Sequence, residues 1–132
     1  HLQDQASIPK LLAMAQGDHS PLVRPVAVEA LGLIGDPHVL PQLLPLVKDT
    51  NAYVRAALSQ ALCLLDDGSP AVEQALRQLT QDEVHHVVTA AQQAQENRRE
   101  YSRAGLSPTE ETEKKGSWLQ RLLHRSGQAH FR

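Results

Sequence analysis

Aromatic residues are scarce in this chain of 132 residues, which has one Trp, one Phe and two Tyr. A core built from this composition must rely on aliphatic side chains and alanine. The single cysteine, Cys63, excludes an intramolecular disulfide. No basic or histidine neighbour lies within a helical turn of it, so we expect a small buried side chain rather than a reactive thiol.

Long apolar runs are also missing. No stretch approaches the roughly 18 apolar residues that a membrane-spanning helix needs, and no secretory signal pattern is found. No segment alternates between apolar and polar residues with a period of two, so no sheet is expected. The sequence starts with His1 rather than Met. From these features we expect a cytoplasmic, all-helical protein.

Residue combinations typical of catalysis or metal binding do not occur. There is no Ser-His-Asp constellation, phosphate-binding glycine loop or nucleophile elbow. His85 and His86 are adjacent, so on a helix they would point about 100° apart and could not share one metal well. Asp66-Asp67-Gly68 lacks the ligand spacing of a calcium loop. We expect no enzyme activity, no metal and no cofactor.

Charge divides the chain into two parts. Residues 1–97 carry five Lys/Arg against eleven Asp/Glu, a net charge of −6, whereas residues 98–132 carry eight against four, a net charge of +4. Binding to nucleic acid depends on Lys and Arg that neutralise phosphates. The acidic first part is therefore a poor platform for nucleic acid, and the predicted boundary separates a domain at 1–97 from a basic tail at 98–132.

A repeated phrase is the strongest positive signal. Residues 23–32, VRPVAVEALG, return 31 positions later at 54–63 as VRAALSQALC. A weaker third copy aligns Asp82 with Asp49, but Val88 replaces Arg55. Self-similarity at this period indicates stacked helical repeats, and a terminal repeat is expected to be more polar because no neighbour covers it.

Each unit reads as two short helices. Asp36-Pro37 and Ser69-Pro70 are typical helix starts, with a capping residue followed by proline at the first position. Gly35 and Gly68 are expected to end the second helices. In the second unit, apolar residues fall at helical spacing on both helices: Val39, Leu40, Leu43, Leu44 and Val47 on the first, and Val54, Ala57, Leu58, Ala61, Leu62 and Leu65 on the second.

Three prolines interrupt the first helix of the second unit. Pro37, Pro41 and Pro45 are four residues apart, and an interior proline removes a hydrogen bond and clashes with the preceding turn. We therefore expect a kinked or loosened helix at this place.

Residues 18–37 (DHSPLVRPVAVEALGLIGDP) and 49–62 (DTNAYVRAALSQAL) carry a family resemblance. The pattern resembles the short HEAT-like repeats first described in phycobilisome bilin lyases, and the resemblance extends from residue 4 to about residue 97. It implies a short α-solenoid of about three helix pairs. It also implies that aspartates and arginines near the turns form a ladder between neighbouring repeats: Asp18, Arg24, Asp49, Arg55 and Asp82.

The resemblance implies a binding function through the ridge of the second helices. The expected partner is another protein with a basic or polar patch. Two alternatives stay open: a subunit of a bilin lyase or isomerase, and a C-terminal regulatory module of a larger, membrane-attached protein. The predicted partner-binding residues are Arg24, Val28, Glu29, Arg55, Ser59, Gln60, Gln92 and Gln93.

The tail contains one amphipathic segment, residues 117–125. Arg121 and Arg125 lie beside its apolar face, and such a segment suits a protein groove, a membrane surface or the flank of the solenoid itself. The predicted docking residues are Trp118, Leu119, Leu122 and Leu123.

The start of the chain falls at a repeat junction. Asp4 aligns with Asp36, so the first three residues correspond to the end of a second helix, and Ile8 and Leu12 would need a covering neighbour. We therefore expect additional repeats of the same chain upstream of His1.

Overall fold

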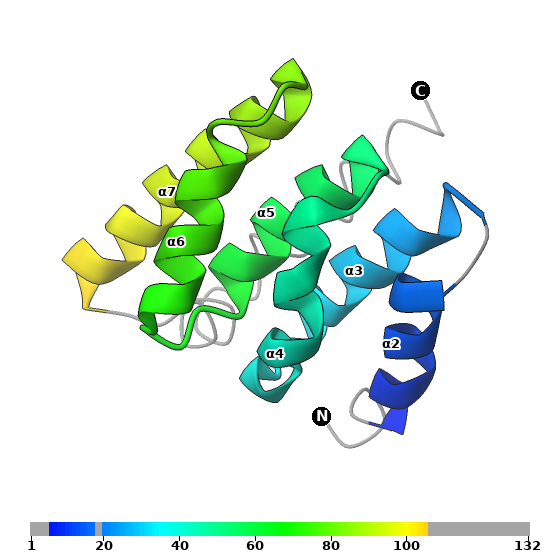
Figure 1. Ribbon diagram of the computed structural model, residues 1–132. Helices are drawn as coiled ribbons and strands as arrows, with labels where there is room; N and C mark the ends of the chain where they lie inside the picture. Colours follow the sequence, from blue (N-terminus) through cyan, green and yellow to red (C-terminus); the bar gives the residue numbers. More distant parts are fainter. Residues whose placement is uncertain (1–5, 18–19, 106–132) are drawn as a thin grey trace, which may run out of the picture.

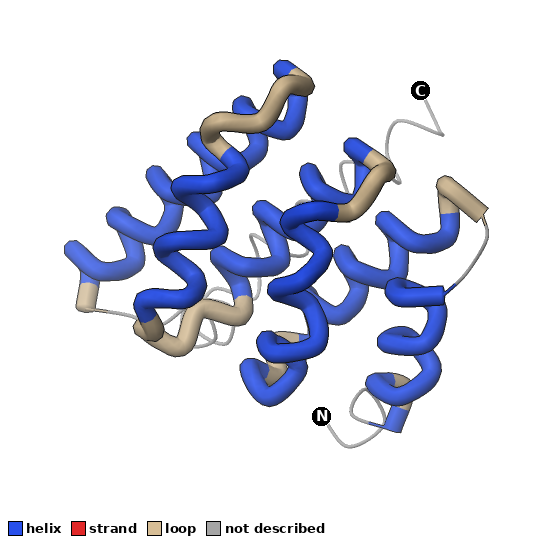
Figure 2. Tube along the Cα trace, viewed as in Figure 1, coloured by secondary structure: helices blue, strands red, loops and turns tan. Residues whose placement is uncertain are grey.

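The computed structural model describes residues 6–17 and 20–105, and within them every regular element is helical (Figure 2). The predicted all-α solenoid is confirmed. Asp4, Asp18 and the tail segment 117–125 lie outside the described residues. Within the described part, no helix is long and apolar enough to cross a lipid bilayer.

The helices form two layers (Figure 1). The first layer holds the first helix of each unit: α2 (Ile8–Gly17), the segments η1 (Pro37–Val39), α4 (Leu40–Leu43) and η2 (Leu44–Lys48), and α6 (Pro70–Leu79). The second layer holds the second helices, which lie side by side: α3 (Val23–Ile34), α5 (Ala52–Leu64) and α7 (His85–Ala104).

The predicted interruption by proline is confirmed. The first helix of the second unit is divided into a 3₁₀ turn, one turn of α-helix and a second 3₁₀ segment. Each proline lies at the first or second position of one of these segments, where the missing N–H group would lack a helical partner in any case. The three prolines thus restart the helix three times without adopting an extended conformation.

The helix starts and ends differ in how far they follow the sequence signals. Asp36 caps η1 by accepting a hydrogen bond from the His38 backbone N–H. Ser69 occupies the N-cap of α6, but its side chain makes no capping hydrogen bond. Gly35 ends α3 with a left-handed φ of 80°. The prediction for Gly68 is wrong, because α5 already ends at Leu64 and Gly68 lies in the following loop.

The last helix continues through the predicted domain boundary. α7 extends beyond residue 97 to Ala104 and ends at Gly105, which adopts a left-handed φ of 71°. The Arg98 and Arg99 side chains, counted with the tail by charge, therefore project from a helix of the solenoid.

Aliphatic residues and alanine fill the space between the layers, as the lack of aromatics predicts. The side chains of Leu31, Leu58 and Leu62 are at most 1% exposed. Small residues bring the second helices close together, and a Cβ built on Gly32 would lie 2.9 Å from Ala61 Cα. The contact between α3 and α5 therefore depends on a residue without a side chain.

Leu31→Ala and Leu62→Ala should each lower the free energy of unfolding by about 2–5 kcal/mol, since each removes a fully buried side chain and leaves a cavity. Leu22→Ala is the matched control, because Leu22 is 76% exposed. Its cost should stay within about 0.5 kcal/mol, the usual range for a surface change. Chemical denaturation followed by circular dichroism measures all three; equal losses would show that Leu31 and Leu62 do not carry the core.

Gly32→Ala should destabilise the fold by about 1–3 kcal/mol, the typical cost of overpacking. Alanine is the better helix former, but the new methyl group meets backbone of α5, which cannot rotate away. Gly17→Ala is the control, since nothing lies within 4 Å of its added Cβ. Thermal melts should show a lower midpoint for Gly32→Ala and an equal or higher one for Gly17→Ala.

Candidate functional site

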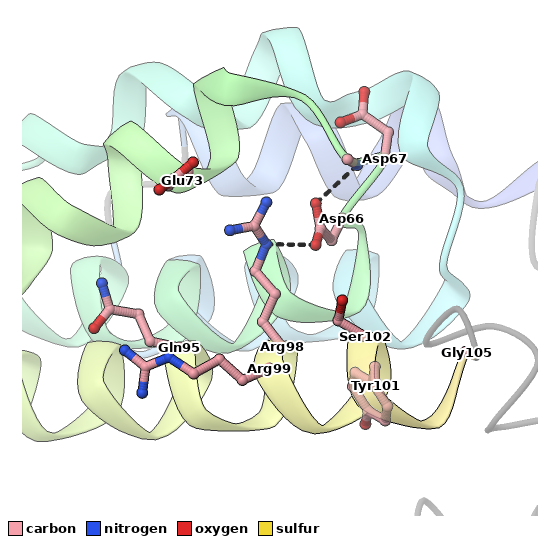
Figure 3. A pocket seen from close by; sticks show the side chains of 10 residues that line it. Asp66, Asp67, Glu73, Gln95, Arg98, Arg99, Tyr101, Ser102 and Gly105 are labelled. Carbon is pink, nitrogen blue, oxygen red and sulfur yellow. Dashed lines mark hydrogen bonds and ion pairs between the residues drawn. The ribbon is translucent and has the colours of Figure 1, made fainter.

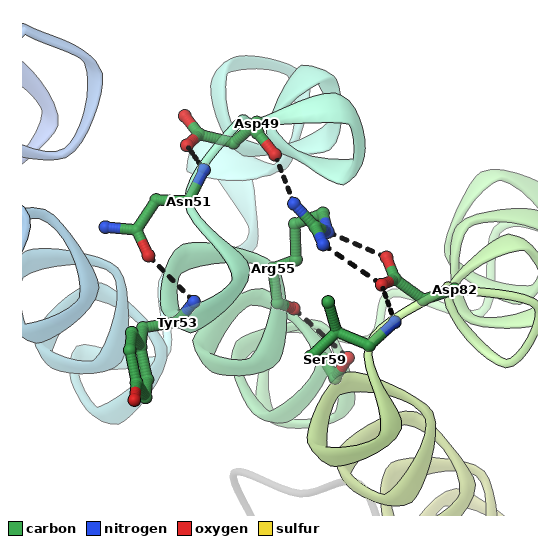
Figure 4. Close-up of polar contacts among 7 residues, drawn as sticks. Asp49, Asn51, Tyr53, Arg55, Ser59 and Asp82 are labelled. Atoms are coloured by element: carbon green, nitrogen blue, oxygen red, sulfur yellow. Dashed lines mark hydrogen bonds and ion pairs between the residues drawn. The ribbon is translucent and has the colours of Figure 1, made fainter.

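Arg55 on α5 ties two successive turns together (Figure 4). Its Nε and Nη2 donate to the two carboxylate oxygens of Asp82, at 2.7 and 3.0 Å, and its Nη1 donates to the backbone oxygen of Asp49 at 2.7 Å. Asp82 also accepts a hydrogen bond from the Val84 backbone N–H. A bidentate arginine–carboxylate pair has a fixed geometry, so this contact sets how α7 begins relative to α5.

Arg24 on α3 makes the corresponding contact one unit earlier. Its Nη1 lies 2.5 Å from Asp49 Oδ2, while Asp49 Oδ1 accepts from the Asn51 backbone N–H. Asn51 caps α5 through the Tyr53 backbone N–H and donates to the Pro21 carbonyl oxygen. Each arginine therefore reaches forward to the aspartate in the next turn, and each aspartate orders that turn.

The carboxylate of Asp82 keeps a pKa below its usual range, mainly because Arg55 donates to it, while burial acts in the opposite direction. The same hydrogen bond raises the pKa of Arg55. Both side chains are largely shielded from water, with 14% exposure for Arg55 and 10% for Asp82. The pair is thus charged and engaged within the stack at neutral pH.

The series of arginine–aspartate contacts between successive units ends at α7, because Val88 occupies the position equivalent to Arg24 and Arg55. A different ion pair joins the other end of α7 to the loop after α5 (Figure 3): Arg98 Nε lies 2.5 Å from Asp66 Oδ2. Asp66 also accepts from the Gly68 backbone N–H. A hollow of about 820 Å³ surrounds this pair, lined by both signs of charge, among them Glu73 and Arg99.

The predicted ridge contains two residues that are not on the surface. Val28 and Ser59 are fully buried, and the Ser59 hydroxyl donates to the Arg55 backbone oxygen. Their assignment to an exposed partner-binding surface is wrong. Arg24 and Arg55 are mostly buried and bonded within the stack, whereas four of the predicted residues are exposed: Glu29, Gln60, Gln92 and Gln93.

The residues that the second layer exposes to solvent are partly different from those predicted for the ridge. Leu22, Val26 and Tyr53 are 76%, 63% and 64% exposed, the exposed large apolar side chains of the described residues. Tyr53 stacks on His86 with ring centroids 5.0 Å apart. Spacings of four and seven residues place further members on the same side of each helix. We call this surface the B-helix face: Leu22, Val26, Glu29, Leu33, Tyr53, Gln60, Leu64, His86, Gln93 and Asn97.

A groove of about 180 Å³ lies in the C-terminal half of the B-helix face. Leu33 and Leu64 contribute apolar walls, and Tyr101 closes the end nearest the tail. Glu29 is the charged residue of its lining. The volume is below the roughly 300–1,000 Å³ typical of small-molecule sites, so the groove suits one or two side chains of another polypeptide.

A sequence signal for this face exists but is weak. Leu22, Tyr53 and His86 occupy the same repeat position, two residues before Arg24, Arg55 and Val88 respectively. Large side chains at that position differ in chemistry, so periodicity alone does not mark them as a set. Their common exposure follows from how the second helices pack side by side, which the sequence pattern does not show.

Among the described residues, Cys63, His85 and His86 show no arrangement typical of catalysis or metal binding. Burial raises the pKa of Cys63 to about 12, so its thiol stays protonated at neutral pH. His85 and His86 are both exposed. No group of three potential metal ligands is found within residues 6–17 and 20–105.

Comparison with known proteins finds a likeness to one repeat family in the first part of the chain. Residues 1–63 match the family model of HEAT repeats. No curated protein and no solved structure matches the chain. Together with the stacked helix pairs, the match supports a HEAT-like repeat protein; it does not single out the bilin lyase type. HEAT repeats generally act as scaffolds for protein interaction.

The Arg55–Asp82 pair makes stability depend on pH. Because folding lowers the pKa of Asp82, the pair stabilises the folded state above the unfolded-state pKa of about 3.9, and this stabilisation is lost as the pH falls through the lower folded-state value. Asp82→Asn should cost about 2–3 kcal/mol at pH 7, since it removes a charged partner from a shielded arginine. It should also flatten the loss of stability below pH 4.

Glu73→Gln is the matched control, because Glu73 and Arg77 form an exposed pair, which should contribute at most about 1 kcal/mol. Urea denaturation from pH 7 to pH 2.5 compares the two variants with the unmodified chain. Equal losses at pH 7 and unchanged acid slopes would show that the Arg55–Asp82 contact does not stabilise the fold.

Proposed function

We propose that the B-helix face binds another protein, and that the chain acts as a small interaction module rather than as an enzyme. The observation that carries this proposal is the exposure of Leu22, Val26 and Tyr53 on one rigid surface. Single exposed apolar residues are ordinary, but a contiguous group of them is typical of an interaction site. The groove continues the same surface.

The rigidity of the face supports binding without rearrangement. α5 packs directly on both α3 and α7, and the bonds from Arg24 and Arg55 fix the turns at which α5 and α7 begin. A preformed surface loses little conformational entropy on association. The exposed apolar side chains are thus held in place before a partner arrives.

The chemistry of the face indicates the kind of partner. Exposed apolar residues lie at one end of the face and the groove lies at the other. Gln60 and Gln93 line the groove and carry both donors and acceptors for hydrogen bonds. Glu29 favours a positive charge opposite it. We infer that the partner presents an amphipathic helix with apolar anchors and at least one basic residue, a recurring mode of peptide recognition.

A photo-activated crosslinker placed at Gln60 of the full chain tests this function in extract from the cells that produce the protein. The matched control is the same crosslinker at Gln74, an exposed glutamine on α6 in the other layer. A discrete adduct from position 60 and none from position 74 is expected. The double variant Leu22→Ser and Val26→Ser should weaken the position-60 adduct about tenfold, equivalent to about 1.4 kcal/mol.

Leu22 and Val26 are 76% and 63% exposed, so this variant should keep its helical circular-dichroism spectrum. Equal adducts from positions 60 and 74, or an adduct unaffected by the double variant, would contradict binding through the B-helix face.

A further inference from the structure

The groove of the B-helix face has an occupant within reach on the same chain. We propose that residues 117–125 dock in this groove with Trp118 as the anchor, and that the external partner must displace them. The proposal rests on the proposed function only in that both use one face. The position of the groove, the length of the following chain and the charges of both parts all favour this occupant.

The groove lies next to the point where the chain leaves the solenoid. Asn97, one turn before Tyr101 on α7, also lines it, and α7 ends at Ala104, less than one further turn along. The tail therefore starts at the edge of the groove. An occupant that begins there needs no path around the stack.

The connecting chain is long enough to return. Trp118 lies 13 positions after Gly105, and a random chain of that length has a root-mean-square span of about 20 Å. The whole of α7 is about 30 Å long, so the groove is well within this range. A short connection of this kind gives an effective concentration on the order of millimolar. Docking therefore requires only weak intrinsic affinity.

Size and charge also agree. A volume of about 180 Å³ between Leu33 and Leu64 accommodates one large side chain, and Trp118 is the only tryptophan of the sequence. The basic segment carries Arg121 and Arg125, and the groove carries Glu29. Beyond α7, residues 106–132 carry five Lys/Arg against three Glu, a net charge of +2, whereas residues 1–105 carry eight Lys/Arg against twelve Asp/Glu, a net charge of −4. Electrostatic attraction therefore favours the tail over a neutral helix.

Docking in the groove would make the B-helix face self-regulated. A tethered segment competes with an external helix for the same groove. The apparent affinity for the partner is therefore the intrinsic affinity multiplied by the fraction of chains whose groove is empty. Ligands that hold the tail elsewhere would raise that affinity.

Trp118 fluorescence in the full chain tests the proposal directly, because no other tryptophan contributes. At low salt we expect a blue-shifted emission maximum and weak quenching by acrylamide. Leu64→Gln and Glu29→Lys should each shift the emission to the red and raise the quenching constant at least about twofold, because Leu64 and Glu29 line the groove. High salt should act in the same direction, while the helical circular-dichroism signal stays constant.

Matched substitutions in the other layer serve as controls. Leu44→Gln replaces a half-buried leucine outside the groove, and Glu73→Lys reverses a charge on α6; neither should change the fluorescence. Leu122→Gln with Leu123→Gln alters only the tail, leaves the described fold untouched and should release Trp118 as the groove variants do. In the crosslinking experiment this tail variant should increase the Gln60 adduct.

Several results would overturn the proposal. Trp118 as accessible in the unmodified chain as in the tail variant would show an undocked segment. Shielding that depends on protein concentration, with a dimer in sedimentation, would assign the groove to a second copy. Shielding that appears only with acidic phospholipid vesicles would assign the segment to a membrane surface. A Gln60 adduct that persists in any of these cases would leave the protein-binding function standing, so the two proposals fail separately.

Discussion

Close packing of the second helices is the constraint on which the rest of this structure depends. A helix pair of this size cannot bury its own apolar side alone, so α3, α5 and α7 must approach closely enough to share one core. Gly32 permits that approach where α3 meets Ala61. With so few aromatic residues, buried leucines such as Leu58 and Leu62 supply most of the apolar contact. Stability is therefore distributed over many interfaces between neighbouring helices.

The polar contacts set the register of this packing and also limit its chemistry. Arg24 and Arg55 each reach the aspartate of the following turn, which orders the turns and leaves these guanidinium groups engaged. Arg98 is engaged with Asp66 at the opposite end of α7. The arginines nearest the predicted ridge thus serve the stack itself. What remains on the B-helix face is mainly apolar and amide chemistry, together with Glu29 and His86, and this mixture suits another polypeptide.

The repeat pattern predicts the exposure of some residues of the candidate site correctly and of others incorrectly. Glu29 and Gln60 were predicted on the surface and are exposed, whereas Val28 and Ser59 were predicted there and are buried. Neighbouring positions on a helix point about 100° apart, so an error of one position moves a side chain from solvent into the core. The sequence does not distinguish buried from exposed positions here, because both carry apolar residues: Val26 is exposed and Val28 is buried. The groove arises from three helices together and has no local sequence signal.

The sequence by itself determined the repeat, the pairing of helices, the all-α class and the interruption at Pro37, Pro41 and Pro45. These features follow from local rules: hydrophobic period, capping residues and the fixed geometry of proline. Only the tertiary structure decided which residues face outward, where Gly68 falls relative to the end of α5, and that Arg98 reaches Asp66 across 32 positions. Those outcomes depend on the distance and rotation between packed helices, which no single segment of the chain encodes.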